Sequence, residues 1–129
     1  MSAYALHHHT LPQKPSKHPW IEKNPNMVPV AVQSALRQAM ILEGKNSSDF
    51  NDLLWIMAQE SGGAVDTRNG TSTARGLFQL LKAQYYLNPN GESSFGNPIE
   101  ECQGGIRYIY ARYKTAEAAK EFWMKHKWY

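Results

Sequence analysis

The feature that most constrains the fold is an amphipathic segment that ends in a glutamate. Phe50, Leu53, Leu54 and Met57 recur at the i, i+3, i+4, i+7 spacing that forms one face of an α-helix. Glu60 follows three residues after Met57, so it falls near the centre of the same apolar stripe. A helix that buries this stripe therefore carries a carboxyl group toward its core.

A carboxylate in such a position is unfavourable unless it is paired or neutral, and burial raises its pKa. A glutamic acid that stays protonated near neutral pH can donate a proton to a leaving oxygen, which is general acid catalysis. The run Ser61-Gly62-Gly63 breaks the helix directly after Glu60, which predicts a carboxyl at the wall of a cleft. The alternative is an ordinary glutamate in the last turn that faces solvent or the glycine loop. Periodicity alone does not decide between the two.

Length and composition limit the other possibilities. A chain of 129 residues has the length of a single domain. Its 14 basic and 11 acidic residues are mostly scattered, which argues against a nucleic-acid partner. The single cysteine, Cys102, excludes a disulfide framework and a multi-thiolate zinc site. No segment approaches the roughly 18–20 apolar residues of a membrane span.

The N-terminal segment differs in composition from the rest. Residues 1–26 hold four prolines and four of the five histidines without apolar periodicity, so we expect an extended proline-rich arm followed by one domain over residues 27–129. The start of the chain lacks the apolar run of a secretory signal. His7-His8-His9 is interpreted as part of a solvated arm rather than a metal site. An arm of this length commonly lies on a partner.

The rest of the chain predicts a mainly helical domain with one small β-hairpin. Asn69-Gly70 is the hairpin signal. Asn97 followed by Pro98 predicts the start of a long helix, within which Gly104-Gly105 indicates close packing against another helix, with the helix of Glu60 as the candidate. Further helices are expected from Pro29 to Gly44, from Leu80 to Tyr86, and from about Thr115 onward.

Two motifs resemble those of the lytic transglycosylase family, which has an SLT domain with a goose-type lysozyme-like fold. The first is Glu60-Ser61-Gly62, and the second is Gly76-Leu77-Phe78-Gln79. The C-terminal half is similar to the subgroup often found in bacteriophage virion proteins. The family's Ala-Tyr-Asn segment is missing, and the terminal Trp128-Tyr129 is its nearest counterpart.

The resemblance implies a mainly α, lysozyme-like fold (α+β in the lysozyme sense) built around the Glu60 helix. It also implies cleavage of the β-1,4 bond between N-acetylmuramic acid and N-acetylglucosamine in peptidoglycan, with formation of 1,6-anhydromuramic ends. Glu60 would act first as the acid and then as the base, and no cofactor or metal is needed. A hydrolase normally needs a second carboxylate. Asp66 could serve and give a hydrolytic muramidase, although a turn role for Asp66 is favoured. An inactive virion structural or wall-binding module is the third hypothesis.

The resemblance also implies a set of residues around the sugar. Ser61 would bond to substrate or orient Glu60, with a solvated helix-end hydroxyl as the alternative. Gln79 would reach the N-acetyl group, and Gly76 would allow close approach of the backbone. Phe78 would lie beside the sugar or in the core, and Tyr129 would bond to Glu60 or fray. The substrate-binding set expected in full is Ser61, Gly76, Phe78, Gln79, Tyr108, Trp128 and Tyr129.

Location follows from the implied substrate, which lies outside the cytoplasmic membrane. Because no export signal is recognised, we expect a phage particle to carry the protein to the host cell wall or periplasm during entry. The alternative is release by a lysis system. The arm over residues 1–26 would then dock onto tail or ejection proteins.

Overall fold

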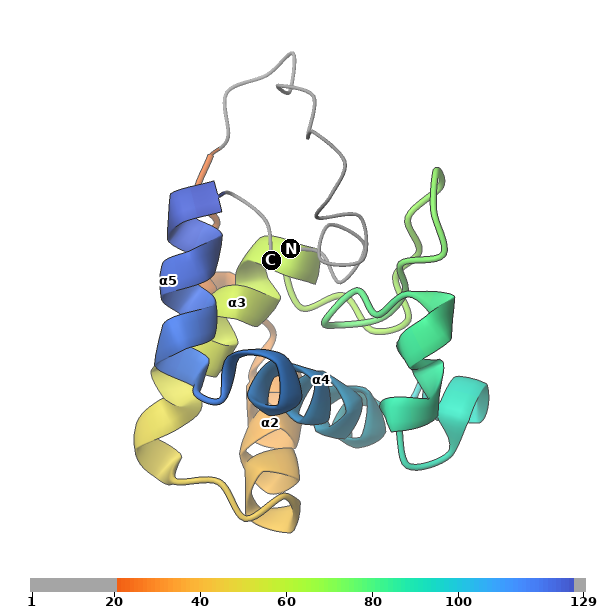
Figure 1. The fold of residues 1–129 in the computed structure, drawn as a ribbon, viewed down its shortest axis with the longest axis horizontal. Coiled ribbons are helices and arrows are strands. Elements are labelled where there is room, and N and C mark those ends of the chain that lie inside the picture. Colours follow the sequence, from red (N-terminus) through yellow and green to blue (C-terminus); the bar gives the residue numbers. More distant parts are fainter. Residues whose placement is uncertain (1–20, 127–129) are drawn as a thin grey trace.

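The computed structural model describes residues 21–126, and within them the chain is mainly helical, which confirms the predicted fold class (Figure 1). The α-helices are α2 (Val30–Leu42), α3 (Phe50–Ser61), α4 (Pro98–Tyr113) and α5 (Ala116–His126). Short 3-10 helices are η1 (Pro25–Met27), η2 (Ser47–Asp49), η3 (Lys82–Leu87) and η4 (Gly91–Ser94). Among these described residues no helix has the length and apolar character needed to cross a membrane.

The ends of the helices follow the sequence signals closely. The Asn97 side chain accepts hydrogen bonds from the backbone N–H groups of Ile99 and Glu100 and so caps α4. The Thr115 hydroxyl accepts from the Ala118 N–H at the start of α5. At the other end of a helix, Gly62 takes the left-handed conformation (φ 65°) that ends α3.

The α-helices named above pack around one core. Figure 1 shows α3 beside α5, while α4 packs mainly on α2. The Arg107 guanidinium in α4 donates two hydrogen bonds of 2.9 and 3.0 Å to the Glu43 carboxylate at the end of α2. The apolar face of α4 is buried, since Cys102, Ile106 and Ile109 are fully enclosed. This packing fixes α4 as the platform on which the loop after α3 rests.

The two adjacent glycines of α4 lie where a close contact was expected, but the partner differs from the prediction. A Cβ atom at Gly105 would come 2.2 Å from Phe78 Cδ2, and one at Gly104 would come 1.7 Å from Asn88 Oδ1. The helix of Glu60 is therefore not the neighbour. The glycines admit side chains of the segment between residues 77 and 88, because the absence of a Cβ lets the Phe78 ring and the Asn88 amide approach the helix closely.

The predicted hairpin forms only in part. Within the described residues it consists of isolated antiparallel bridges that join Arg75 to Arg68 and to Leu80. The turn is wider than an Asn-Gly turn, because the Asn69 N–H donates to the Ala74 carbonyl and Gly70 has no positive φ. The Asn69 side chain accepts from both the N–H and the hydroxyl of Thr71, which closes the wider turn locally. The short helix expected at Leu80–Tyr86 is the 3-10 helix η3, shifted by one or two residues.

The segment before α2 packs across the end of α3. The Gln59 side chain pairs with both backbone groups of Lys23, accepting from its N–H at 2.9 Å and donating to its carbonyl at 2.8 Å. Lys23 lies within the predicted arm, so the part of the arm that the structure describes contacts the domain. The proposed division at residue 26 stays a prediction.

Candidate active site

Glu60 occupies the last turn of α3 and is half-buried. Its Oε2 accepts a 2.8 Å hydrogen bond from the indole Nε1–H of Trp123 in α5. Trp123 is 4% exposed and meets Trp55 edge to face, with ring centroids 5.3 Å apart. The carboxyl therefore lies at the border of the core, in contact with a neighbouring helix, rather than as a freely solvated last-turn glutamate.

The hydrogen bond from Trp123 to Glu60 is a feature of the candidate site that sequence reasoning missed. The Trp123 ring lies in the core. A buried indole, however, needs an acceptor for its N–H, and a carboxyl on a core-facing position is an obvious candidate. The two residues are 63 positions apart, so only the pairing of α3 with α5 brings them together.

Ser61 shapes the turn that follows Glu60. Its hydroxyl donates to the Met57 carbonyl at 3.2 Å and accepts from the Gly63 N–H at 3.1 Å. Gly63 in turn packs against Val28, whose Cγ1 would lie 2.7 Å from a Cβ at that position. These bonds give Ser61 a structural role at the helix end, and its predicted contact with substrate stays a prediction.

The second motif lies on a tightly bonded loop. Gly76 has φ 85°, and a Cβ there would lie 2.8 Å from both Glu101 Oε1 and Phe95 Cε1, so the position requires glycine. The Gln79 side chain is 5% exposed, and its Nε2 donates to the carbonyls of Gly76 (2.9 Å) and Thr67 (3.3 Å). No donor within residues 21–126 bonds to its Oε1, which leaves that oxygen as an acceptor.

Two predicted substrate-binding rings lie in the core instead of on the surface. Phe78 is 1% exposed and packs on Gly105, which corresponds to the core alternative. Tyr108 is 6% exposed, and burial raises its pKa. This placement disfavours direct contact between either ring and a sugar. Trp128 and Tyr129 lie outside the described residues.

Asp66 is the carboxylate that a hydrolytic mechanism would use. It has a left-handed backbone (φ 56°), and its two oxygens accept from Arg75 Nε at 2.6 Å and Arg75 Nη2 at 3.4 Å. The hydrogen bond from Arg75 holds the pKa of Asp66 below its usual range. Arg75 also stacks on the Phe95 ring, 4.5 Å from its centroid. Both carboxylate oxygens of Asp66 therefore take part in an ion pair with Arg75 within the loop.

Glu101 is a buried carboxylate that the sequence pattern did not single out. It is 2% exposed and accepts backbone N–H bonds from Asp66, Leu77 and Gly96. The available signal was its position four residues before Gly105, on the same face of α4.

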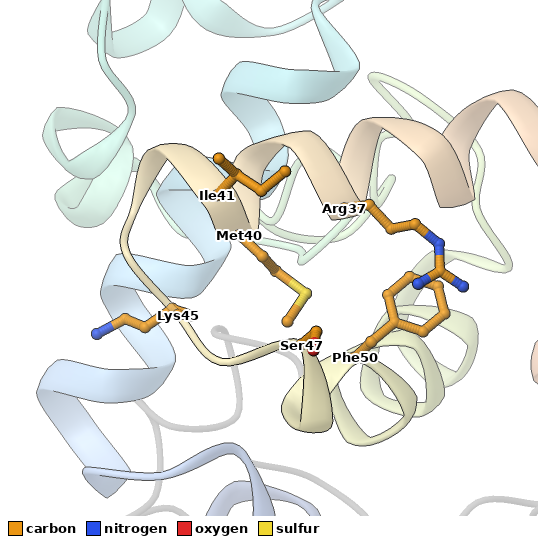
Figure 2. Close-up of a pocket in the computed structure, with 6 residues that line it drawn as sticks. All are labelled: Arg37, Met40, Ile41, Lys45, Ser47 and Phe50. Carbon is orange, nitrogen blue, oxygen red and sulfur yellow. The ribbon is translucent and has the colours of Figure 1, made fainter.

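A separate pocket lies at the opposite end of α3 from Glu60. It measures about 230 Å³ and occupies the turn between α2 and α3, as Figure 2 shows. Two cations at this pocket lie over aromatic rings, with Arg37 over Phe50 and Lys45 over Tyr110. The lining residues are Arg37, Met40, Ile41, Lys45, Ser47 and Phe50. Because Phe50 begins α3 and Glu60 lies in its last turn, this pocket is not part of the Glu60 site.

In the part of the chain that the structure describes, no group of three or more His, Cys, Asp or Glu residues is placed to hold a metal ion. The histidines His7, His8 and His9 lie outside that part.

Comparison with known proteins identifies the family. Residues 39–125 match the family described as the Transglycosylase SLT domain, a span that includes Glu60, Gln79 and Trp123. Comparisons with curated proteins and with solved structures give no match. Since the matched span covers more than half of the 129 residues, the chain belongs to the transglycosylase SLT domain family and is a lytic transglycosylase-type enzyme whose substrate is peptidoglycan.

Proposed function

We propose that the protein cleaves the β-1,4 bond between N-acetylmuramic acid and N-acetylglucosamine by intramolecular transfer, leaving a 1,6-anhydromuramic end. The observation that carries the proposal is the half-buried Glu60 carboxyl, held at the end of α3 by the Trp123 N–H. It supports a single residue that serves in turn as acid and base.

The indole contact assigns different tasks to the two oxygens of Glu60. The indole nitrogen only donates, so Oε2 acts as an acceptor and the proton of the neutral acid belongs on Oε1. In the first step Oε1–H protonates the glycosidic oxygen while its bond to the muramic C1 breaks. The N-acetyl group of the substrate stabilises the positive charge that develops at C1.

The second step restores the enzyme. The Glu60 carboxylate takes the proton of the C6 hydroxyl as O6 bonds to C1 and closes the anhydro ring. Glu60 is then neutral again, and no water enters the products. Both steps need one group that gains and loses a proton near the working pH.

The bonding of the other carboxylates favours this single-carboxylate scheme over hydrolysis. A hydrolase of the inverting type needs a carboxylate that activates water. Both oxygens of Asp66 accept from Arg75, and those of Glu101 accept backbone N–H groups. We further propose that Gln79 Oε1 accepts the N–H of the substrate's acetamido group, since no described residue donates to it.

The test compares wild type with Glu60→Gln on purified peptidoglycan. We expect the variant to lose activity about 10³-fold, because the amide cannot donate and then accept the proton. Glu117→Gln, in the first turn of α5 and exposed, is the matched control that should retain activity. Mass spectrometry should find products lighter by one water than hydrolysed ends. Hydrolysed ends would instead establish a muramidase, and equal clearing by Glu60→Gln would reject the assignment of Glu60.

We also propose that the protein is carried in a phage particle and opens the host cell wall during entry, with the proline-rich arm over residues 1–26 docked on tail or ejection proteins. The similarity of the C-terminal half to the phage subgroup supports this location. Mass spectrometry of purified particles should detect the protein, and deletion of residues 1–20 should remove it from them. Particles that lack the wild-type protein would refute the proposal.

A further inference from the structure

The strongest unexplained feature outside the Glu60 contact is the burial of Glu101. No lysine or arginine within residues 21–126 forms an ion pair with it. Instead, Oε1 accepts from the Leu77 N–H at 2.7 Å, and Oε2 accepts from the N–H groups of Asp66 at 3.0 Å and Gly96 at 2.8 Å. One side chain of α4 thereby joins the loop after α3, the second motif and the turn before α4.

The loop that Glu101 holds contains residues in unfavourable backbone conformations. Asp66 and Gln79 have φ values of 56° and 53°, a left-handed region that residues with a Cβ rarely adopt. Such conformations persist only where the surrounding structure fixes them, and they cluster at functional sites. Glu101 bonds to Asp66 itself and to Leu77, two residues before Gln79. Its carboxylate therefore lies where it can fix both ends of the strained segment.

We propose that Glu101 is a positioning residue that holds Gln79 in the orientation needed for substrate, through the loop over residues 66–79. The inference rests on the proposed function of Gln79. An ionised carboxylate suits the task because both oxygens accept and neither donates. A glutamine at this position would turn an NH₂ group toward backbone N–H donors.

The neighbouring Glu100 provides a matched comparison. It lies in the same first turn of α4 and also accepts hydrogen bonds, from the side chains of Asn90, Ser94 and Asn97. None of these donors belongs to the loop over residues 66–79. Glu100 therefore shares the first turn of α4 and the residue type of Glu101, but not its connection to Gln79.

The proposal implies a pH response of the loop. Burial raises the pKa of Glu101 above that of an ordinary glutamate, while its three backbone N–H bonds act in the opposite direction. The Asp66 carboxylate, which is itself paired with Arg75, also raises the pKa of Glu101; on α4 the chain neighbours of Glu101 are the carboxylate of Glu100 and the thiol of Cys102. Protonation of Glu101 removes acceptor capacity, so the loop should loosen at a higher pH than an ordinary glutamate would predict.

The activity test uses Glu101→Gln, Glu100→Gln and Gln79→Ala in the full chain, with kcat and KM measured on purified glycan strands. We expect Glu101→Gln to lower kcat/KM by roughly 10- to 100-fold, and Glu100→Gln to change it by less than about 3-fold. In the Gln79→Ala background, Glu101→Gln should lower kcat/KM by less than about 3-fold, because the residue it positions is gone. An equal loss in both backgrounds would overturn the proposal.

A second measurement uses only the wild-type protein, so it depends neither on enzymatic activity nor on whether a Glu101 variant folds. In a pH titration of wild type followed by NMR, the amide signals of Asp66, Leu77 and Gly96 and the side-chain amide of Gln79 should shift together, with one midpoint above that of an ordinary glutamate. Independent shifts would refute the anchoring. A wild type without activity on peptidoglycan would refute the proposed function alone, since this titration still decides whether Glu101 controls Gln79.

Discussion

The two regions that bear the motifs are held by different kinds of interaction. At the end of α3, the side chain of Glu60 meets a donor from another helix, Trp123, among packed rings. In the loop over residues 66–79, the backbone itself is held by the buried carboxylate of Glu101, with two residues in left-handed conformations. One region fixes a side chain through a hydrogen bond from a packed ring, and the other fixes a main chain through hydrogen bonds to a buried carboxylate.

This difference fits the separate tasks proposed for the two regions. An acid and base must exchange its proton, so its support should come from a donor that occupies one oxygen and does not titrate, as an indole does. A residue that orients substrate has no such need, and its loop can be as rigid as hydrogen bonds make it. We therefore expect changes in the loop to act through its folded geometry, whereas changes near Glu60 should act directly on proton transfer.

The largest expected effect on stability comes from a change in α4, on which the loop packs. Gly105→Ala places a methyl group 2.2 Å from Phe78 Cδ2 in a fully packed part of the core. Because Phe78 and Gly105 are both buried, the extra methyl group must displace packed atoms, and we expect a loss of roughly 2–3 kcal/mol in the free energy of unfolding. Urea unfolding of wild type and variant measures it.

The matched control for this change is Gly70→Ala. A Cβ at Gly70 meets nothing within 4 Å, and the backbone there has no positive φ. The unfolding free energy should therefore stay within about 0.5 kcal/mol of wild type. Similar losses for the two variants would show that the contact between Gly105 and Phe78 does not hold the loop on α4.

The next largest effect is expected on kcat, from a change at the end of α3 where Trp123 bonds to Glu60. Trp123→Phe keeps a buried ring on α5 but removes the N–H that bonds to Glu60 Oε2. We expect kcat to fall about 10-fold, which corresponds to about 1.4 kcal/mol of transition-state stabilisation. Trp55→Phe is the control, since Trp55 packs against Trp123 but shows no bond to Glu60. If both variants lower kcat equally, ring packing rather than the N–H supports Glu60.

Much of the fold was predictable because its determinants are local. The apolar spacing from Phe50 to Met57 marks α3, the Asn97 cap marks α4, and Glu60 stands out as a carboxyl on a core face. These features arise from residues within one or two helical turns of each other. The same local rule failed at Asn69-Gly70, where the Asn69 side chain closes a wider turn than the dipeptide predicts.

The rest of the site depends on contacts between distant residues. Trp123 lies 63 positions from Glu60, and Glu101 lies 35 positions from Asp66, so periodicity carries no information about either pair. Gly105 combines a feature that the local sequence predicts with a contact that it does not predict. Its place in a helix predicted a close contact, but only the fold shows that Phe78 makes that contact.

The smallest expected effect separates the ion pair in the loop from the Glu101 anchor. Asp66→Asn removes the charge that pairs with Arg75 but keeps the Asp66 backbone N–H bond to Glu101. The Asp66 side chain is 36% exposed, so solvent weakens the pair, and we expect a loss of only about 0.5 kcal/mol in the free energy of unfolding at pH 7. Because Arg75 holds the folded-state pKa of Asp66 below the ordinary value of about 3.9, the pair stabilises the fold above that pH and stops doing so as the pH falls through the folded-state pKa. Urea unfolding of wild type and variant should therefore differ at pH 7 and converge at the most acidic pH at which both still fold. If the free energies of unfolding of wild type and variant still differ at that pH, Asp66 supports the loop through contacts other than its charge. The contrast between a loop held by a buried carboxylate and a helix end held by a packed ring would then be wrong for this part of the loop.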